Sequence, residues 1–298
     1  MCDDRTLREM EEYLLKDATE LTRRRFGALV VGAGVIAALP ASADALEVTE
    51  SMVEVTTADG VAEACLVKPA GGRSPGILMW PDAYGLRAAL KQMARRLAES
   101  GYTVLVPNPY YRSTRLPALP EPIDMKSPEV RKLWGPLRAP LTADAVTRDA
   151  LAFLKYLDAL PSVDSARKLG TFGYCMGGAM ALRAAAAIPG RVGAAASFHG
   201  AGLVTDKPDS PHLLAPAMRA HCLIAIAESD DKAEPGAKDA LRAAFAAASL
   251  PAEIEVYEGT LHGWCPPDTA VYNEAQAERA WSRLLALFSG ALVPTGAA

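Results

Sequence analysis

The sequence predicts one α/β domain whose sheet is mostly parallel and doubly wound and begins with an antiparallel hairpin. Apolar runs of four to eight residues alternate with helical segments along most of the chain, which is typical of parallel strands covered by helices on both faces. The 298 residues contain no internal repeat and no linker. Hydrophobic residues make up 50% and charged residues 22%, so we expect a sizeable core.

The order of elements follows from the same patterns. Two segments, residues 46–56 and 61–69, alternate in polarity around the turn Ala58-Asp59-Gly60 and predict the hairpin. The buried strands are expected at residues 75–80, 102–108, 167–174, 191–198, 221–228 and 252–259. The helices are expected at residues 86–100, 141–160, 175–189, 236–249 and 270–292. Residues 112–140 are rich in Pro and Arg, and we expect them to form an insertion that covers the carboxyl edge of the sheet.

The first 45 residues have the pattern of an export signal. Three arginines, Arg23 to Arg25, precede a weakly apolar run of about 14 residues, which is shorter than the roughly 20 needed to span a bilayer. This segment resembles a twin-arginine signal, and Ala43 to Ala45 resemble a cleavage site. We therefore expect the twin-arginine export machinery to deliver residues 46–298 to the periplasm or the medium, with no stable membrane span. A buried N-terminal helix or a retained anchor is the alternative.

Charge and residue spacing exclude several kinds of partner. A net charge of -4 offers no basic surface for a phosphate backbone, so nucleic acid is not expected. The five cysteines form no CxxC pair, and the four histidines show neither HExxH nor HxH spacing. Neither a metal site nor a cofactor is therefore expected. The expected partner is a small molecule.

A candidate nucleophile stands between a predicted strand and a predicted helix. Residues 173–178 read GYCMGG, which places Cys175 in the G-x-nucleophile-x-G arrangement of a nucleophile elbow. Glycines allow the sharp turn, and the N-terminus of the helix favours a thiolate and an oxyanion. A cysteine that merely fills a small core space would give the same local pattern, so partners elsewhere must decide.

Two later strand-to-helix loops contain suitable partners. Residues 228–235 hold two adjacent acids, of which we choose Asp231 to orient the histidine, with Asp230 as the alternative. His262 follows the last predicted strand and is the candidate general base. The chain order of nucleophile, acid and histidine is that of α/β-hydrolases. Together these residues predict a Cys-His-Asp triad.

Two further motifs accompany GYCMGG: WPDAYG at residues 80–85 and PNPYYR at residues 107–112. With these three motifs the chain resembles, from about Ala58 to Leu292, the dienelactone hydrolase (carboxymethylenebutenolidase) family. The resemblance implies that Asp82, in place of the family's Glu, contacts the resting thiol, and that the backbone N–H groups of Ala83 and Met176 form the oxyanion hole. It also implies that Arg112 binds a substrate carboxylate, although the second such arginine of the family is here Pro266.

We therefore predict a hydrolase of carboxylic esters or lactones. His262, oriented by Asp231, activates Cys175 for attack on the carbonyl, and a thioester acyl-enzyme follows. Two alternatives are a non-catalytic binding protein that keeps the pocket and an acyltransferase or general esterase that uses the same three residues. The sequence does not predict the natural substrate or the oligomeric state.

Overall fold

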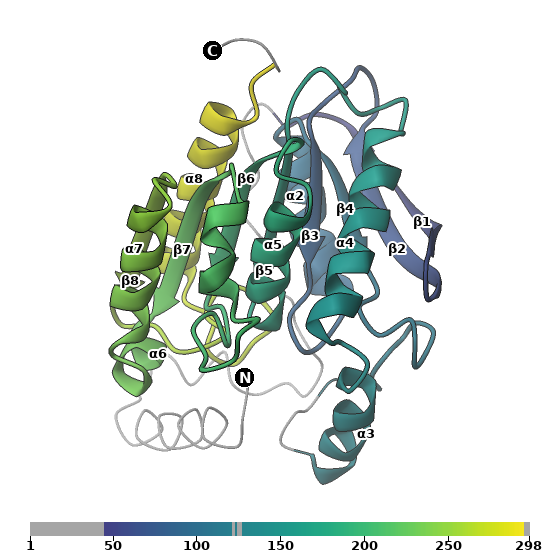
Figure 1. The fold of residues 1–298 in the computed structure, drawn as a ribbon. Coiled ribbons are helices and arrows are strands. Elements are labelled where there is room, and N and C mark those ends of the chain that lie inside the picture. Colours follow the sequence, from purple (N-terminus) through teal and green to yellow (C-terminus); the bar gives the residue numbers. More distant parts are fainter. Residues whose placement is uncertain (1–44, 121–122, 124–126, 295–298) are drawn as a thin grey trace, which may run out of the picture.

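An eight-stranded sheet runs through the computed structural model, which describes residues 45–120, 123 and 127–294 (Figure 1). The strands lie in the order β1-β2-β4-β3-β5-β6-β7-β8. The pairs β1–β2 and β2–β4 are antiparallel, and the remaining pairs are parallel. The predicted fold class is therefore confirmed. The predicted export signal, apart from its last residue, lies outside the described residues.

The strands agree closely with the apolar runs. They are β1 (Val48–Thr57), β2 (Gly60–Pro69), β3 (Gly76–Trp80), β4 (Thr103–Pro107), β5 (Leu169–Tyr174), β6 (Val192–Phe198), β7 (His221–Ala227) and β8 (Ala252–Tyr257). Every residue of β3, β4, β5 and β6 is buried. Helices cover both faces of these central strands, and this explains why their sequences are continuously apolar rather than alternating.

Helices occupy both faces of the sheet (Figure 1). They are α2 (Ala88–Glu99), α3 (Pro128–Arg138), α4 (Ala143–Asp158), α5 (Met176–Ala187), α6 (Glu228–Ala233), α7 (Ala237–Ala247), α8 (Glu274–Ala291) and the 3-10 helix η2 (Pro211–Ala217). One core lies between the sheet and α2 and α8, and the other lies between the sheet and α4, α5 and α7. Within the described ranges, no helix is both long enough and apolar enough to cross a bilayer.

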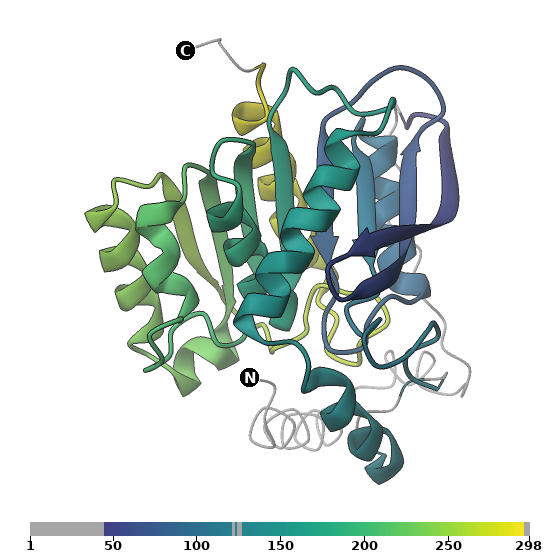
Figure 2. The same ribbon diagram turned by 45° about the vertical axis from the view of Figure 1, so that its right-hand side comes forward.

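Two α-helices, and the 3-10 helix η2, were not expected from the sequence. In the insertion, α3 begins at Pro128 after Ser127, whose Oγ accepts from the N–H of Val130 at 3.5 Å. Pro at the first position and Ser at the cap are strong local helix signals, but the prolines and arginines of residues 112–140 led us to expect an irregular insertion there. The helix lies beyond the carboxyl ends of the strands (Figure 2). The second, α6, occupies most of the segment that we expected to be a loop after β7.

Candidate active site

Cys175 joins β5 to α5 in a backbone conformation that L-residues rarely adopt. Its φ is 52° and its ψ is -120°, and such conformations persist where the surroundings hold them. The N–H of Cys175 donates to the carbonyl of Phe198 at 3.1 Å, and its carbonyl accepts from Gly178 and Ala201 at 3.0 and 3.1 Å. The turn is therefore fixed by β6 and the loop after it. The elbow predicted from GYCMGG is present.

The glycines of the elbow are needed because backbones approach each other closely there. A Cβ on Gly177 would lie 2.6 Å from the carbonyl oxygens of both Trp80 and Pro81. A Cβ on Gly173 would collide with the backbone of Gly177, and one on Gly178 would collide with Ser197 Oγ. These glycines let α5 press against β3, β5 and β6, which directs the first turn of the helix at the nucleophile.

His262 lies between Cys175 and an acid. Its Nδ1 is 2.9 and 3.1 Å from the two carboxylate oxygens of Asp230, and its backbone N–H donates to Ser229 Oγ at 3.0 Å. A hydrogen bond also joins the side chains of His262 and Cys175. Because Asp230 occupies Nδ1, the ring presents Nε2 to the sulfur. The thiol, the imidazole and the carboxylate are thus linked by a chain of hydrogen bonds.

The charges around His262 favour an ion pair between its imidazolium and the thiolate of Cys175. Burial by itself lowers the pKa of His262, but the negative charges of Cys175 and Asp230, with hydrogen bonds to both, outweigh burial and raise that pKa well above its ordinary value. The shift favours the protonated imidazole, which lies between the sulfur of Cys175 and the carboxylate of Asp230. An imidazolium in this position stabilises a thiolate, the reactive form of cysteine.

The structure corrects the choice of Asp231 as the orienting acid. Its Oδ2 accepts from Lys238 Nζ at 2.8 Å, whereas Asp230 lies beside His262. Both acids are in the first turn of α6, where successive side chains point about 100° apart, so only one of them can face the ring. The sequence predicted an acid in this segment, but without the short helix it could not tell which of the two neighbours faces inward.

The structure also gives Asp82 a different partner from the expected thiol. Its two carboxylate oxygens accept from Arg87 Nη1 at 2.7 Å and Nη2 at 3.0 Å. One of them also accepts from the N–H of Tyr84 at 2.9 Å. The shorter side chain of Asp, compared with Glu, and a buried arginine five residues later explain the change. Sequence reasoning assigned no role to Arg87.

Tyr110 connects the two residues predicted to supply oxyanion donors. Its hydroxyl donates to the carbonyl of Ala83 at 2.8 Å and lies 3.7 Å from Met176 Sδ. Trp134 of α3 donates to the same hydroxyl at 3.1 Å. Burial raises the pKa of Tyr110, so the phenol remains a donor. Met176 begins α5, where N–H groups have no acceptor within the helix. Ala83 and Met176 are thus brought to the same side of the elbow, and Tyr110 is a residue that the sequence did not single out.

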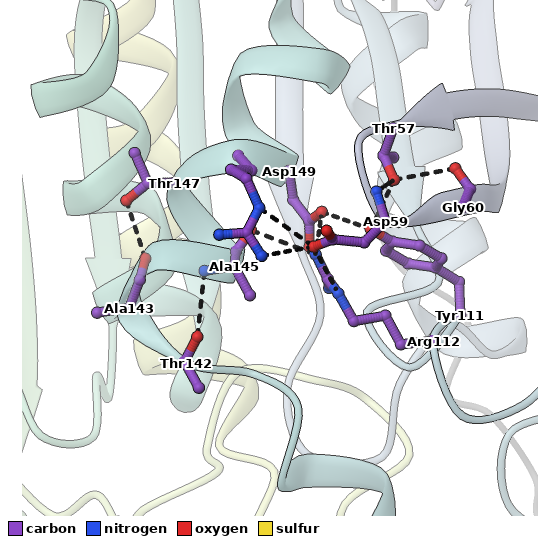
Figure 3. Close-up of polar contacts among 11 residues, drawn as sticks. Thr57, Asp59, Gly60, Tyr111, Arg112, Thr142, Ala143, Ala145, Thr147 and Asp149 are labelled. Carbon is purple, nitrogen blue, oxygen red and sulfur yellow. Dashed lines mark hydrogen bonds and ion pairs between the residues drawn. The ribbon is translucent and has the colours of Figure 1, made fainter.

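Arg112 is held by two carboxylates (Figure 3). Its Nη1 and Nη2 donate to Asp149 at 2.7 Å each, and its Nε donates to Asp59 Oδ2 at 3.0 Å. Tyr111 donates to Asp149 as well, at 2.7 Å. The Arg112 side chain is 11% exposed and ties the β1–β2 turn to α4. The Arg112 guanidinium is thus paired with carboxylates of the protein, and its expected role in binding a substrate carboxylate stays a prediction.

A second histidine packs against the first. The ring centroids of His199 and His262 are 5.0 Å apart, edge to face. His199 is buried at φ 40°, and within the described part of the chain neither of its ring nitrogens has a hydrogen-bond partner. Burial, followed by the charge of His262, lowers the pKa of His199 well below its ordinary value. His199 is therefore neutral at the pH where His262 is charged.

A metal centre was not expected from the sequence. Among the residues that the structure describes, no three His, Cys, Asp or Glu side chains are grouped so that they could hold a metal ion. The chemistry available at Cys175 is that of a thiol, an imidazole, a carboxylate and backbone N–H groups.

Fold and site together define an α/β-hydrolase: a mostly parallel sheet carries a cysteine at a strained strand-to-helix turn, and later loops supply a histidine and an acid. The sequence profile of the dienelactone hydrolase family matches residues 62–292, and the chain belongs to this family. It is accordingly a hydrolase of the carboxylic ester or lactone type.

Other proteins resemble this chain in sequence or in fold. The chain is 28% identical over 279 residues to a provisionally named carboxymethylenebutenolidase of Methylorubrum extorquens, over 89% of this chain and 92% of that protein. It is 28% identical over 167 residues to the carboxymethylenebutenolidase of Pseudomonas putida, over 56% of this chain and 67% of the relative. A provisionally named dienelactone hydrolase from Klebsiella pneumoniae superposes with a TM-score of 0.71 at 22% identity, over 82% of this chain and 99% of the other. The structural likeness supports the fold.

Proposed function

We propose that this protein hydrolyses a carboxylic ester or lactone with Cys175 as nucleophile, His262 as acid and base, and Asp230 as the acid that orients His262. The observation that carries the proposal is the chain of hydrogen bonds from Cys175 through His262 to Asp230 at the carboxyl edge of the sheet. Nucleophile, base and orienting acid in mutual contact are the arrangement that nucleophilic catalysis of acyl transfer requires.

The reaction follows from the charges at rest. The Cys175 thiolate attacks the substrate carbonyl, forming a C–S bond and placing negative charge on the carbonyl oxygen. N–H groups of Ala83 and Met176 stabilise that oxyanion, and each such donor contributes about 3 to 4 kcal/mol in comparable sites. As the tetrahedral intermediate collapses, the C–O bond breaks and His262 gives its proton to the leaving oxygen. Water activated by the now neutral His262 then attacks the thioester, which releases the carboxylic acid and restores the thiolate and the imidazolium.

Charged groups near the site bear on the substrate class. Arg112 is bound by Asp59 and Asp149, and Arg87 is bound by Asp82 and a second aspartate, Asp268. Neither guanidinium is available to pair with a substrate carboxylate without breaking an internal ion pair. We therefore propose that the site takes esters or lactones whether or not they carry a carboxylate. The names of the relatives suggest a lactone as the first compound to test.

Turnover of nitrophenyl acetate and of an unsaturated lactone tests the mechanism. Cys175→Ala should abolish both activities without loss of folding, and an acyl group should be detectable on Cys175 of the wild type by mass spectrometry. Cys222→Ala is the matched control, because Cys222 is equally buried, in β7. Wild-type turnover by Cys175→Ala would end the thiol mechanism. Adding a competing alcohol separates hydrolysis from acyl transfer, since an acyltransferase would form the new ester preferentially.

We further propose that residues 1–45 direct export by the twin-arginine route. The support is the sequence TRRRF before a weakly apolar run and the small residues at 43–45. Replacing Arg23 and Arg24 together by lysine should keep the protein in the cytoplasm, whereas Arg5→Lys should not. Fractionation of cells that express both variants is the measurement, and export of the double lysine variant at the wild-type level would refute this route.

A further inference from the structure

A second buried charge system lies at the edge of the sheet that holds the triad. Arg87, immediately before α2, has a side chain that is 5% exposed. Its Nη1 and Nη2 donate to Asp82 at 2.7 and 3.0 Å, and its Nε and Nη2 donate to Asp268 at 2.5 and 2.9 Å. Nη1 also contacts the carbonyl of Gly85 at 3.3 Å. All three nitrogens of the guanidinium are thus engaged by the protein.

The two carboxylates belong to the two loops that must cooperate in catalysis. Asp82 immediately precedes Ala83, and it shapes that turn by accepting from Tyr84 N–H through its side chain and from Gly85 N–H through its carbonyl. Asp268 lies in the loop between β8 and α8 that begins just before His262. That loop is closed on itself by Thr269 Oγ1, which donates to the carbonyl of Gly263 at 2.8 Å. Arg87 therefore joins the oxyanion turn to the histidine loop.

We propose that Arg87 is a positioning residue, which fixes the turn of Ala83 relative to the loop of His262 so that both act on the same carbonyl. This inference rests on the proposed function. Without the guanidinium, Asp82 would be a buried carboxylate facing a second carboxylate, and their repulsion would move the two loops apart. A geometric constraint of this kind acts on the transition state, because the oxyanion donor must be in place when charge develops.

Arg87→Met tests the inference. We expect kcat for nitrophenyl acetate to fall roughly 10- to 100-fold with KM nearly unchanged, which is the signature of an interaction made in the transition state. Alkylation of Cys175 by iodoacetamide should keep its wild-type rate, since the partners of His262 are Cys175 and Asp230. Arg87→Lys should recover part of kcat, because it keeps the charge but cannot bridge two carboxylates as a planar fork does.

Arg96→Met is the matched control for lost stability. Arg96 is on α2 itself, makes a two-point pair with Glu278 at 2.7 and 2.6 Å, and lies over Trp281, much as Arg87 lies over Tyr84. It ties α2 to α8, so its loss should lower Tm and leave kcat unchanged. Asp268→Asn provides a second test if Arg87→Met does not fold, because Asp268 is more exposed and the Arg87–Asp82 pair remains. It should lower kcat at constant KM.

The outcomes separate the two ideas. A wild-type kcat in Arg87→Met, calculated per active site that reacts with iodoacetamide, would overturn the positioning role. If Arg87→Met does not fold, a wild-type kcat in Asp268→Asn would do the same. A fall of kcat in Arg96→Met as large as that in Arg87→Met would also overturn it. Full activity of Cys175→Ala would overturn the proposed function itself. An inactive Cys175→Ala together with a fully active Arg87→Met would leave the thiol mechanism standing and remove only the role of Arg87.

Discussion

Replacing each of the two adjacent acids of α6 by asparagine, one at a time, gives the sharpest test of the triad. Asp230→Asn removes the charge whose oxygens lie 2.9 and 3.1 Å from Nδ1 of His262. With charge centres about 4 Å apart and an effective dielectric constant of about 20, the lost attraction is roughly 4 kcal/mol. At 1.36 kcal/mol per factor of ten, kcat/KM should fall about 10³-fold. The amide can also turn its NH₂ toward the ring and favour the wrong tautomer, which acts in the same direction.

Asp231→Asn is the matched control for that substitution. It is the same chemical change one residue further along α6, and it removes a partly exposed pair with Lys238, an interaction worth about 0 to 1 kcal/mol. We expect Tm to shift slightly and kcat/KM to remain near the wild-type value, measured as initial rates of nitrophenyl acetate hydrolysis. An Asp231→Asn variant as impaired as Asp230→Asn, or an Asp230→Asn variant with wild-type activity, would refute the assignment of Asp230.

Three further predictions concern packing and ionisation. Gly178→Ala should destabilise the fold by about 1 to 3 kcal/mol, because the new Cβ collides with Ser197 Oγ. Its control, Gly290→Ala, lies in α8 with open space around it and should stabilise the fold by about 0.5 to 1 kcal/mol. Thermal melts that reverse this order would contradict the packing argument. His199→Phe should raise Tm, because it removes two buried nitrogens without described partners, each costing about 1 to 3 kcal/mol; a lower Tm would show that those nitrogens are satisfied. Iodoacetamide at pH 7 should label Cys175 far faster than Cys222, since burial raises the pKa of Cys222 to about 12 and its thiolate forms only as the pH approaches that value; equal labelling rates on peptide mapping would argue against an activated Cys175.

The sequence predicted the fold well because the central strands are buried on both faces. A strand such as β3 has no exposed residue, so its apolar run is continuous and easy to recognise. Helix α4 was expected at residues 141–160 and spans Ala143–Asp158, because its apolar residues recur at helical spacing over four turns. Helix α3 begins at a Ser cap with Pro at its first position. Helix α6 has only six residues, and residues 228–235 carry too few apolar positions to show a period.

From the sequence we could predict which segments meet at the site, but not every residue that makes contact there. Strand order brings the elbow and the loops after β7 and β8 to one edge, so the GYCMGG motif and the chain order were enough to predict that Cys175 and His262 lie together. Choosing between Asp230 and Asp231 requires the rotation of α6, which no pattern in residues 228–235 reveals. Tyr110 was part of the quoted PNPYYR text, yet its contact with Ala83 spans 27 positions and depends on how two loops fold over the elbow.

The same limit applies to Arg112, because its motif does not reveal which residues it contacts in the fold. Arg112 occupies its expected place after β4, but its partners Asp59 and Asp149 come from segments 53 and 37 residues away. A motif fixes where a side chain starts, whereas the tertiary fold decides whether its charge is already neutralised. Arg112 and Arg87 are both bound by aspartates, so under the proposed function substrate recognition would rest on His262 and the backbone N–H groups of Ala83 and Met176, which act on the carbonyl itself. Recognition of this kind does not depend on the charge of the acyl group, so Arg112→Ala should reduce turnover of substrates with and without a carboxylate to the same degree.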